Sequence, residues 1–383
     1  MYISRLKLRN WKNFNAIDVR LGLRVFLIGP NASGKSNLLD AFKFLRDVAE
    51  DGLKKAVEGA RGGVSAIRCL SAKGYSNIDI EVELTESQET KWVYILSINQ
   101  GKKSKGPKGP LVQREIVRCG DETLLERPTT EDEKDPLRLT QTALEQISEN
   151  KLFRPVADFF KSISYQHLLP QLIRDPSGFS PRPVQNDPYG RDFLLRKCKT
   201  PEKTREARLK KIARALSIAV PQLSELTIEM DDTGTPHLIG RYEHWRARGA
   251  KQNESQFSDG TLRLLGLLWT VFEGTGPLLL EEPEISLHPE LVRRLPGIFR
   301  RLSRAQKTPR QIIISTHSEE MLRDPGIAPE EVLRLEPSEE GTLVKLPDEA
   351  ERKAMAAGLT AADVLMPKAA PKELHQLELE FKW

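Results

Sequence analysis

The most constraining feature of this chain is the glycine-rich stretch at residues 29–36, Gly-Pro-Asn-Ala-Ser-Gly-Lys-Ser. It follows an apolar run at residues 23–28 and precedes apolar residues at helical spacing up to about Glu50. A GxxxxGK[ST] pattern between a buried strand and a helix is typical of a loop whose backbone N–H groups surround a phosphate. The alternative is a plain glycine-rich turn. The pattern predicts an α/β fold with this strand buried on both faces.

The chemistry of such a loop assigns a role to each polar residue. Lys35 would reach the β- and γ-phosphates of ATP as a point charge, and the Ser36 hydroxyl would be a ligand of Mg²⁺. The helix that begins near Gly34 adds its positive end to the phosphate site. The residues expected to contact the nucleotide here are Asn31, Ala32, Ser33, Gly34, Lys35, Ser36 and Asn37.

A second motif places acids at the end of an apolar strand, Pro-Leu-Leu-Leu-Glu-Glu-Pro-Glu at residues 277–284. Ligands of open α/β sheets bind where parallel strands end, so these carboxylates are expected at the phosphate site. We assign Glu281 to the metal and Glu282 to orienting and deprotonating the attacking water. Taken without the phosphate loop, the same residues would more often form a surface turn.

Two further motifs have both a structural and a functional interpretation. His317 follows the apolar run at residues 312–314 and is expected near the γ-phosphate, although a histidine in this position is often structural. Ser258, Asp259 and Gly260 precede a leucine-rich helical stripe, which indicates a helix cap. The same helix start could bind an anion, including a phosphate held by another molecule's loop.

The remaining patterns give the organisation of the chain. Strands are expected at residues 2–9 and 14–19, three period-two strands between 77 and 117, mostly helices from 137 to 220, and a strand pair at 223–230 and 235–242. Core strands are expected at 277–280 and 310–314, with a helix at 291–304. We therefore divide the chain into a first core half with a β subdomain (1–135), an inserted, mainly helical lobe (136–250), a second core half (251–346) and a partly ordered tail (347–383).

Composition excludes several classes of protein. No apolar run approaches 18 residues, so no membrane span is expected, and the alternating N-terminal residues indicate a strand instead of a signal peptide. Cys69, Cys119 and Cys198 have no CxxC spacing and fit reduced thiols in a cytoplasmic protein. The net charge of +5 is compatible with binding to DNA or RNA. Basic residues gather at 102–108 and 196–211, which could equally be a hairpin tip and the solvated face of a helix.

The four motifs, in this order, resemble the ABC-type ATPase head of the SMC, RecF and OLD families. They are most similar to the stand-alone AAA family ATPases of the AAA_21 group. The resemblance is carried by residues 2–50 and 256–318, especially Leu-Glu-Glu-Pro-Glu-Ile-Ser-Leu-His-Pro at 280–289. Residues 8–14 resemble the first-hairpin motif of these families, whose basic residue lies beside the nucleotide, and Lys12 stands at that position.

The resemblance implies a P-loop NTPase fold of the ABC-type head, with an antiparallel β subdomain and an inserted helical lobe. It implies Mg²⁺-dependent ATP hydrolysis in a head-to-tail homodimer with ATP at the interface. Ser258, Asp259 and Gly260 would meet the γ-phosphate bound by the other copy, residues 285–288 would link the two sites, and His317 would be the switch histidine.

The chain also departs from the wider pattern. Glu281 stands where transporter-type members have aspartate, and the signature reads Ser-Asp-Gly instead of Ser-Gly-Gly. Gln88, Gln100 and Gln113 are equal candidates for the family's glutamine loop. The sequence between the motifs lacks a long coiled coil, and the residues after Ser318 are too few for a toprim nuclease domain. We therefore expect a separate effector or nuclease as the partner.

These features favour an ATPase that acts as a nucleotide-gated sensor or clamp on nucleic acid, or as the ATPase subunit of an antiphage defence or DNA repair system. The alternative is an ATP-binding scaffold or switch with little turnover that controls a partner. A transporter subunit fits less well, because of the Glu-Glu-Pro-Glu sequence and the long insertion.

Overall fold

A computed structural model describes residues 1–71, 74–86, 91–101, 108–174, 187–243, 250–304 and 309–369 of the chain. Gln88 and all of the basic segment at 102–108 except Lys108 lie outside these ranges. Among the described residues, no helix is long and apolar enough to cross a membrane.

The core is a six-stranded sheet with the strand order β15-β14-β3-β13-β12-β8. Its strands are β3 (Arg24–Ile28), β8 (Ser164–Gln166), β12 (Leu278–Glu281), β13 (Ile312–Ser315), β14 (Val332–Ser338) and β15 (Gly341–Lys345). All neighbours pair in parallel except β14 and β15. Every side chain of β3 is buried, as the apolar run predicts for a strand covered on both faces.

A second sheet is antiparallel, with the order β2-β1-β4-β5-β6-β7. Its strands are β1 (Tyr2–Trp11), β2 (Phe14–Arg20), β4 (Ile78–Thr85), β5 (Lys91–Gln100), β6 (Pro110–Cys119) and β7 (Glu122–Arg127). Strict alternation along β4 puts Ile78, Ile80, Val82 and Leu84 on the buried face. These side chains share one core with Val25 and Leu27 of β3 and with helix α1 (Lys35–Asp51), so α1 connects the two sheets.

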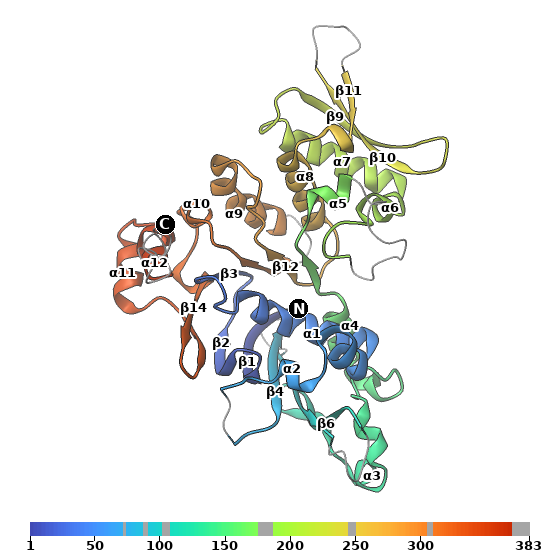
Figure 1. Ribbon diagram of the computed structural model, residues 1–383, viewed down its shortest axis with the longest axis vertical. Coiled ribbons are helices and arrows are strands. Elements are labelled where there is room, and N and C mark those ends of the chain that lie inside the picture. The colour runs from blue at the N-terminus through green and yellow to red at the C-terminus, as the bar shows by residue number, and fades with distance from the viewer. Residues whose placement is uncertain are drawn as a thin grey trace, which may run out of the picture.

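A third unit lies beyond the other face of the core sheet (Figure 1). It contains α5 (Pro170–Arg174), α6 (Phe193–Cys198), α7 (Glu202–Leu216), β9 (Leu223–Met230), β10 (Pro236–Tyr242), β11 (Ala250–Asn253) and α8 (Asp259–Phe272). The leucine stripe of α8 packs with Phe26, Ile28 and Leu280 in a second hydrophobic core. Helix α8 therefore connects this lobe to the same strands that carry the phosphate loop and the acids.

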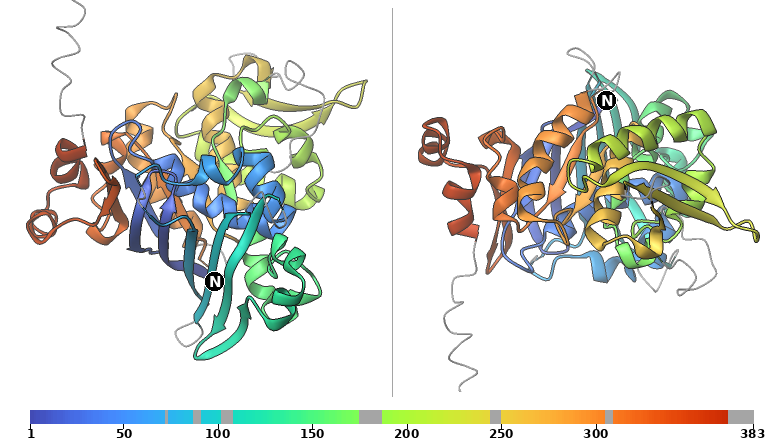
Figure 2. Two further views of the ribbon diagram at one scale, coloured as in Figure 1. Left: turned by 60° about the horizontal axis from the view of Figure 1, so that its bottom comes forward. Right: turned by 90° about the horizontal axis from the view of Figure 1, so that it is seen from above.

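The remaining elements flank these units. The helices are α2 (Val64–Ile67), α3 (Thr130–Lys134), α4 (Arg154–Lys161), α9 (Pro289–Arg304), α10 (Glu319–Leu322), α11 (Glu349–Ala356) and α12 (Ala361–Ala369). The short π- and 3-10-helical turns are η1 (Lys55–Gly59), η2 (Pro136–Thr140), η3 (Glu149–Leu152), η4 (Glu254–Gln256) and η5 (Pro329–Glu331). In both views of Figure 2 the red helices α11 and α12 lie at the outer side of the core sheet, where α12 packs against β14.

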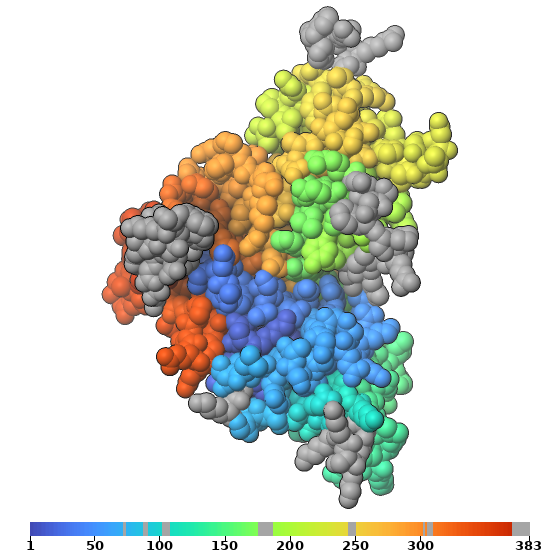
Figure 3. Space-filling model, viewed as in Figure 1, coloured from blue at the N-terminus to red at the C-terminus, as the bar shows by residue number. Residues whose placement is uncertain are grey.

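Segments far apart in sequence are joined by one buried glutamine. Gln311 Nε2 donates to the carbonyls of Ile3 and Gly22 (2.8 Å each), and Gln311 Oε1 accepts from the Ile3 N–H (3.0 Å). This side chain therefore fixes the start of β1 against the start of β13. On the face shown in Figure 3, blue N-terminal residues lie beside the orange C-terminal half.

Two expectations about the organisation of the chain need correction. Strand β8 lies in the core sheet, although residues 136–250 were expected to form an inserted lobe, and α4 packs beside α1. The lobe has a three-stranded sheet instead of a strand pair, because β11 also pairs with β10. In the tail at 347–383, which was expected to be partly ordered, the described residues up to 369 include the helices α11 and α12.

Candidate nucleotide site

The phosphate loop follows β3 and depends on two glycines for its shape. Gly29, Ala32 and Gly34 all have positive φ (151°, 61° and 98°). A Cβ at Gly29 would lie 2.5 Å from the carbonyl oxygen of Leu335, and a Cβ at Gly34 would lie 2.0 Å from Asn13 Nδ2. Any larger residue at either position would therefore clash with the elements that surround the loop.

The loop holds one buried cation. Lys35 is 6% exposed, and its ammonium donates to the carbonyls of Gly29 (2.9 Å) and Pro30 (3.1 Å). Burial lowers the pKa of Lys35 to about 8, against the opposing effect of Glu282 and Glu281. The Ser33 hydroxyl is buried and has no hydrogen-bond partner within the described ranges. A buried ammonium and an unsatisfied hydroxyl both fit a phosphate group, whose oxygens would accept their hydrogen bonds.

Side chains from both ends of the chain brace this loop. Asn13 Nδ2 donates to the Ser33 carbonyl (3.1 Å) and to Thr342 Oγ1 (2.7 Å), and Thr342 Oγ1 donates to the same carbonyl (2.9 Å). Asn37 Nδ2 donates to Asn13 Oδ1 (2.8 Å), and Trp11 Nε1 donates to the Asn37 carbonyl (2.9 Å). The β1–β2 turn and the β14–β15 hairpin thus fix the backbone of the loop.

The two residues expected to hold the metal are in contact. The Ser36 hydroxyl donates to one carboxylate oxygen of Glu281, and the Tyr165 hydroxyl donates to the other. His167 Nδ1 lies 3.2 Å from the Glu281 carbonyl oxygen. Because β12 and β3 are both parallel strands of the core sheet, their ends meet at one edge. A serine hydroxyl and a carboxylate at this edge are suitable ligands for Mg²⁺.

The second acid and the histidine form a pair beside them. Glu282 has a positive φ of 44°, unusual for a residue with a side chain, and its Oε1 lies 3.5 Å from His317 Nε2. Burial and the charge of Lys35 lower the pKa of His317, so the imidazole is neutral at pH 7. The structure thus brings Lys35, Ser36, Glu281, Glu282 and His317 together, while their roles remain predictions.

A third acid supports this pair, and sequence reasoning gave it no role. Glu284 Oε1 accepts from Thr316 Oγ1 (2.6 Å) and from the His317 N–H (3.1 Å). Burial raises the pKa of Glu284. These bonds fix the backbone that carries the His317 side chain. The signal in the sequence was the extra acid after Pro283.

The expected signature residues lie at the start of α8. Ser258 caps the helix and accepts from the Thr261 N–H (3.2 Å), while Asp259 accepts from Arg174 (2.5 Å) and Gln171 (2.9 Å). A Cβ at Gly260 would lie 2.8 Å from the Ser286 carbonyl oxygen, so this helix start touches the expected linking loop at 285–288. Across the described ranges, no hydrogen bond or ion pair joins residues 258–260 to the loop at 29–36.

A buried arginine connects the signature helix with the acids. Arg263 is 1% exposed and donates to the carbonyls of Leu168 and Glu282, the latter at 2.5 Å. The positive φ of Glu282 is thereby held by a residue of α8. A shift of α8 would therefore move the backbone of Glu282.

The AAA_21 family model, described as "AAA domain, putative AbiEii toxin, Type IV TA system", matches residues 24–323. This match includes the phosphate loop, the acids, the helix start at Ser258 and His317. The chain belongs to the AAA_21 family.

Curated relatives and solved structures agree with this assignment. The AAA_21 chain is 32% identical over 92 residues to the DNA replication and repair protein RecF of Synechocystis, and 30% identical over 96 residues to RecF of Lactobacillus johnsonii. These stretches are 23% and 24% of the chain, and 23% and 26% of the relatives. The chain therefore spans about a quarter of the length of the curated relatives it matches.

The fold is similar to that of SMC heads. A crystal structure of an SMC head bound to the C-terminal winged-helix domain of ScpA aligns with a TM-score of 0.54 and 16% identity, over 92% of the chain and 99% of that structure. An SMC head from Pyrococcus furiosus, bound to the C-terminal domain of ScpA, aligns with a TM-score of 0.51 and 14% identity, over 93% of the chain and 98% of that structure. The expected ABC-type ATPase head with an antiparallel sheet is confirmed, in a P-loop ATPase family related to RecF and SMC heads.

The candidates for the glutamine loop lie elsewhere in this AAA_21 chain. Gln100 ends β5 and Gln113 lies on β6, both in the antiparallel sheet, so neither stands beside the acids. Two other residues contact Glu281: Tyr165 of the short strand β8, and His167 directly after this strand. The third candidate, Gln88, lies outside the described residues.

Lys12 lies in the turn after β1, with its ammonium 2.6 Å from Asp40 Oδ2 on α1. Arg61 binds the same carboxylate at 2.8 Å. Lys12 is thus held beside the helix that follows the phosphate loop, and its contact with the nucleotide stays a prediction.

Proposed function

We propose that this protein hydrolyses ATP, with Mg²⁺, at an interface between two copies of itself. The observation that carries the proposal is the convergence of Lys35, Ser36, Glu281, Glu282 and His317 at one edge of the core sheet. Each of these groups has the chemistry that phosphoryl transfer to water requires.

The residues divide the reaction between them. Lys35 and the loop N–H groups would hold the β- and γ-phosphates, and Glu282 would orient the attacking water and accept its proton. Mg²⁺, held by Ser36 and Glu281, would neutralise charge on the phosphates. Neutral His317 would donate a hydrogen bond towards the γ-phosphate, with its backbone fixed by Glu284.

A second copy would complete the site. Residues 258–260 sit at a capped helix start and contact the 285–288 loop instead of their own phosphate loop. The start of α8, a helix of 14 residues, presents N–H groups and a positive dipole end suited to a phosphate. We therefore infer a head-to-tail dimer in which these residues close over the ATP of the other copy.

The biological role would be that of a nucleotide-gated sensor or clamp on nucleic acid, or of the ATPase subunit of a defence or repair system with a separate effector. The RecF relatives are named for DNA replication and repair, and the family description refers to a toxin–antitoxin system. Exposed lysines of α7, Lys203, Lys210 and Lys211, offer phosphate contacts. The alternative, a scaffold that binds ATP with little turnover, shares the site but not the chemistry of Glu282.

Steady-state phosphate release separates these two candidates. We expect Mg²⁺-dependent turnover in the wild-type protein, loss of at least about a hundredfold in Glu282→Gln with ATP binding retained, and loss of ATP binding in Lys35→Ala. Glu290→Gln, an exposed acid on the following helix, is the matched control. Turnover in Glu282→Gln equal to wild type would exclude the proposed role of this residue. No measurable turnover in the wild type, with or without duplex DNA, would favour the scaffold.

A further inference from the structure

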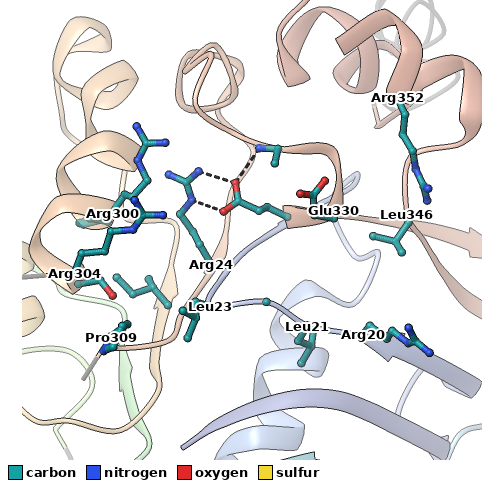
Figure 4. Close-up of a pocket in the computed structure, with 16 residues that line it drawn as sticks. Arg20, Leu21, Leu23, Arg24, Arg300, Arg304, Pro309, Glu330, Leu346 and Arg352 are labelled. Atoms are coloured by element: carbon teal, nitrogen blue, oxygen red, sulfur yellow. Dashed lines mark hydrogen bonds and ion pairs between the residues drawn. The ribbon is translucent and has the colours of Figure 1, made fainter. Parts of the chain in front are cut away.

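A second pocket, of about 570 Å³, lies at the opposite end of the core strands from the phosphate loop. It is formed where β3 and β13 begin, beside the last turns of α9 and the start of α11 (Figure 4). Because β3 has five residues at about 3.3 Å each, roughly 16 Å of strand separates this pocket from the nucleotide site. The mechanism proposed above uses none of its residues.

Four exposed arginines border this rear pocket: Arg20, Arg300, Arg304 and Arg352. Within the described ranges, none of their guanidinium groups forms an ion pair with a carboxylate. Two of them bond to backbone instead, Arg352 Nε to the Pro347 carbonyl (2.8 Å) and Arg300 to the Gly326 carbonyl (3.4 Å). These cations are therefore available to a ligand.

The acids of the pocket do not neutralise this charge. Glu331 is bound by Arg24, whose buried guanidinium lies 2.6 Å from Glu331 Oε2, and by the Ala328 N–H (2.9 Å). Glu330 is the one exposed carboxylate among the described lining residues. Because four unpaired guanidinium groups outnumber the one free carboxylate, the pocket favours an anionic ligand. A planar guanidinium can form two parallel hydrogen bonds with one carboxylate, so carboxylates fit this pocket well.

The walls between the arginines are apolar. Leu23 is 41% exposed and Leu346 is 36% exposed at the mouth, and Phe299 and Ile312 lie beneath them. Exposed leucines inside a concave surface are matched by apolar side chains of a ligand, whereas a duplex backbone would leave them uncovered. The combination of cations and leucines therefore selects a chain that carries both acids and apolar residues.

We propose that the rear pocket binds an acidic, leucine-bearing segment of a partner protein. The inference rests on the proposed function, in which a separate effector acts with the ATPase. Because the nucleotide site lies at the other end of the strands, a partner held here would stay bound when two copies close over ATP. The pocket thus gives the effector a place that does not compete with the dimer interface.

Binding of a defined probe tests this proposal. The probe is a fluorescein-labelled dodecapeptide with three repeats of Glu-Leu-Glu-Ser, and the comparison peptide replaces each leucine with serine at unchanged charge. Fluorescence anisotropy is measured with the full chain, without nucleotide, at two salt concentrations. We expect saturable binding of the leucine peptide, weakened by roughly tenfold or more in the variant Arg300→Glu/Arg304→Glu.

The matched control is Arg294→Glu/Arg301→Glu, which reverses two exposed arginines of the same helix that do not line the pocket. This control should bind the leucine peptide as the wild type does. Leu346→Ser removes an apolar wall without altering charge. It should weaken binding of the leucine peptide and leave binding of the serine peptide unchanged. Unchanged thermal melting of each variant establishes that it is folded.

Several outcomes would overturn the proposal. The first two are the absence of saturable binding of the leucine peptide and an equal loss of affinity for it in both double arginine variants. The other two are equal affinity of the wild type for the two peptides, and competition by a twelve-nucleotide oligo-dT as strong as that by unlabelled leucine peptide. The assay involves no hydrolysis, so its failure is independent of the ATPase proposal. The same titration on Lys35→Ala should give wild-type affinity even if that variant binds no ATP.

Discussion

At the scale of single residues, the surroundings of Lys35 determine how ATP binding depends on pH. Burial favours the neutral amine, so the pKa of Lys35 falls to about 8, near physiological pH. The ammonium that would meet the phosphates is thus partly lost under mildly alkaline conditions. The same shift means that the folded state releases a proton which the unfolded state keeps, so Lys35 contributes more to stability as pH rises above 8.

We expect the affinity for ATP to fall by up to about tenfold between pH 7 and pH 9. The protonated fraction of Lys35 in the free protein drops from about nine-tenths to about one-tenth over this interval. A fluorescent, non-hydrolysable ATP analogue, measured with the wild-type protein, avoids turnover and keeps the Glu282 charge that opposes the shift of the Lys35 pKa. An affinity of the wild-type protein that stays constant over this range would contradict the assignment.

Glu284 should act as a positioning residue for His317. Glu284→Gln can still accept from Thr316 and from the His317 N–H, so we expect kcat within about threefold of wild type. Glu284→Ala leaves both donors unsatisfied and should lower kcat by tenfold or more, with little change in ATP affinity. Equal losses in the two variants would mean that the carboxylate charge, and not its hydrogen bonds, matters.

At the scale of elements, the short strand β8 shows where sequence reasoning reached its limit. The phosphate loop, the acids and the histidine each follow an apolar run, so their strands were expected, and the structure places them together. Residues 164–166 have no such run, because β8 lies at the sheet edge and pairs with β12 on one side only. Tyr165 and His167 were missed for this reason. Thr342 was missed because its contact with Asn13 spans 329 residues.

Tyr165→Phe tests what β8 contributes. The change removes the hydrogen bond to Glu281 and keeps the ring, so the fold should survive while Glu281 is less firmly oriented. We expect the Mg²⁺ concentration for half-maximal turnover to rise by about tenfold, with little effect on ATP binding without metal. Tyr75→Phe, which loses a hydroxyl bond to Asp79 on the antiparallel sheet, is the control. If the Mg²⁺ concentration for half-maximal turnover rose equally in both variants, the effect would not come from the bond between Tyr165 and Glu281.

The end of α8 depends on one buried cation. Arg310 is 1% exposed and donates to the carbonyls of Thr270 (2.6 Å), Gly276 (2.7 Å) and Glu273. Arg310→Met would leave these carbonyls without donors and should lower the free energy of unfolding by about 2–4 kcal/mol. Urea denaturation measures this change. A loss below about 0.5 kcal/mol would show that water replaces the guanidinium at no cost.

At the scale of the whole molecule, the two hydrophobic cores lie on opposite faces of one sheet. Helix α1 follows the phosphate loop into the first core, and α8 carries the signature residues and packs in the second. Arg263 joins α8 to the backbone of Glu282 across the sheet edge. Docking of a second copy on the start of α8 would therefore act directly on the acid proposed to activate water.

A trapped dimer is the corresponding prediction. Glu282→Gln with Mg-ATP should elute at twice the monomer mass in size-exclusion chromatography with light scattering, and adding Ser258→Arg should return it to monomer, because the long side chain would occupy the interface. Ser258→Ala controls for the lost helix cap, and Ser255→Arg places the same side chain on an exposed neighbour. Dimers that persist with Ser258→Arg would exclude this helix start from the interface.

The position of β3 in the sheet also determines how late in synthesis this strand can pair with its neighbours. Both strands that pair with β3 come from the far end of the chain, β13 at residues 312–315 and β14 at 332–338. At about 5–20 residues per second, synthesis reaches them roughly 15–60 s after β3 has emerged. Until then the strand that carries the phosphate loop has both edges unpaired, so we expect that a nascent chain cannot hold ATP before residues 312–338 have been made.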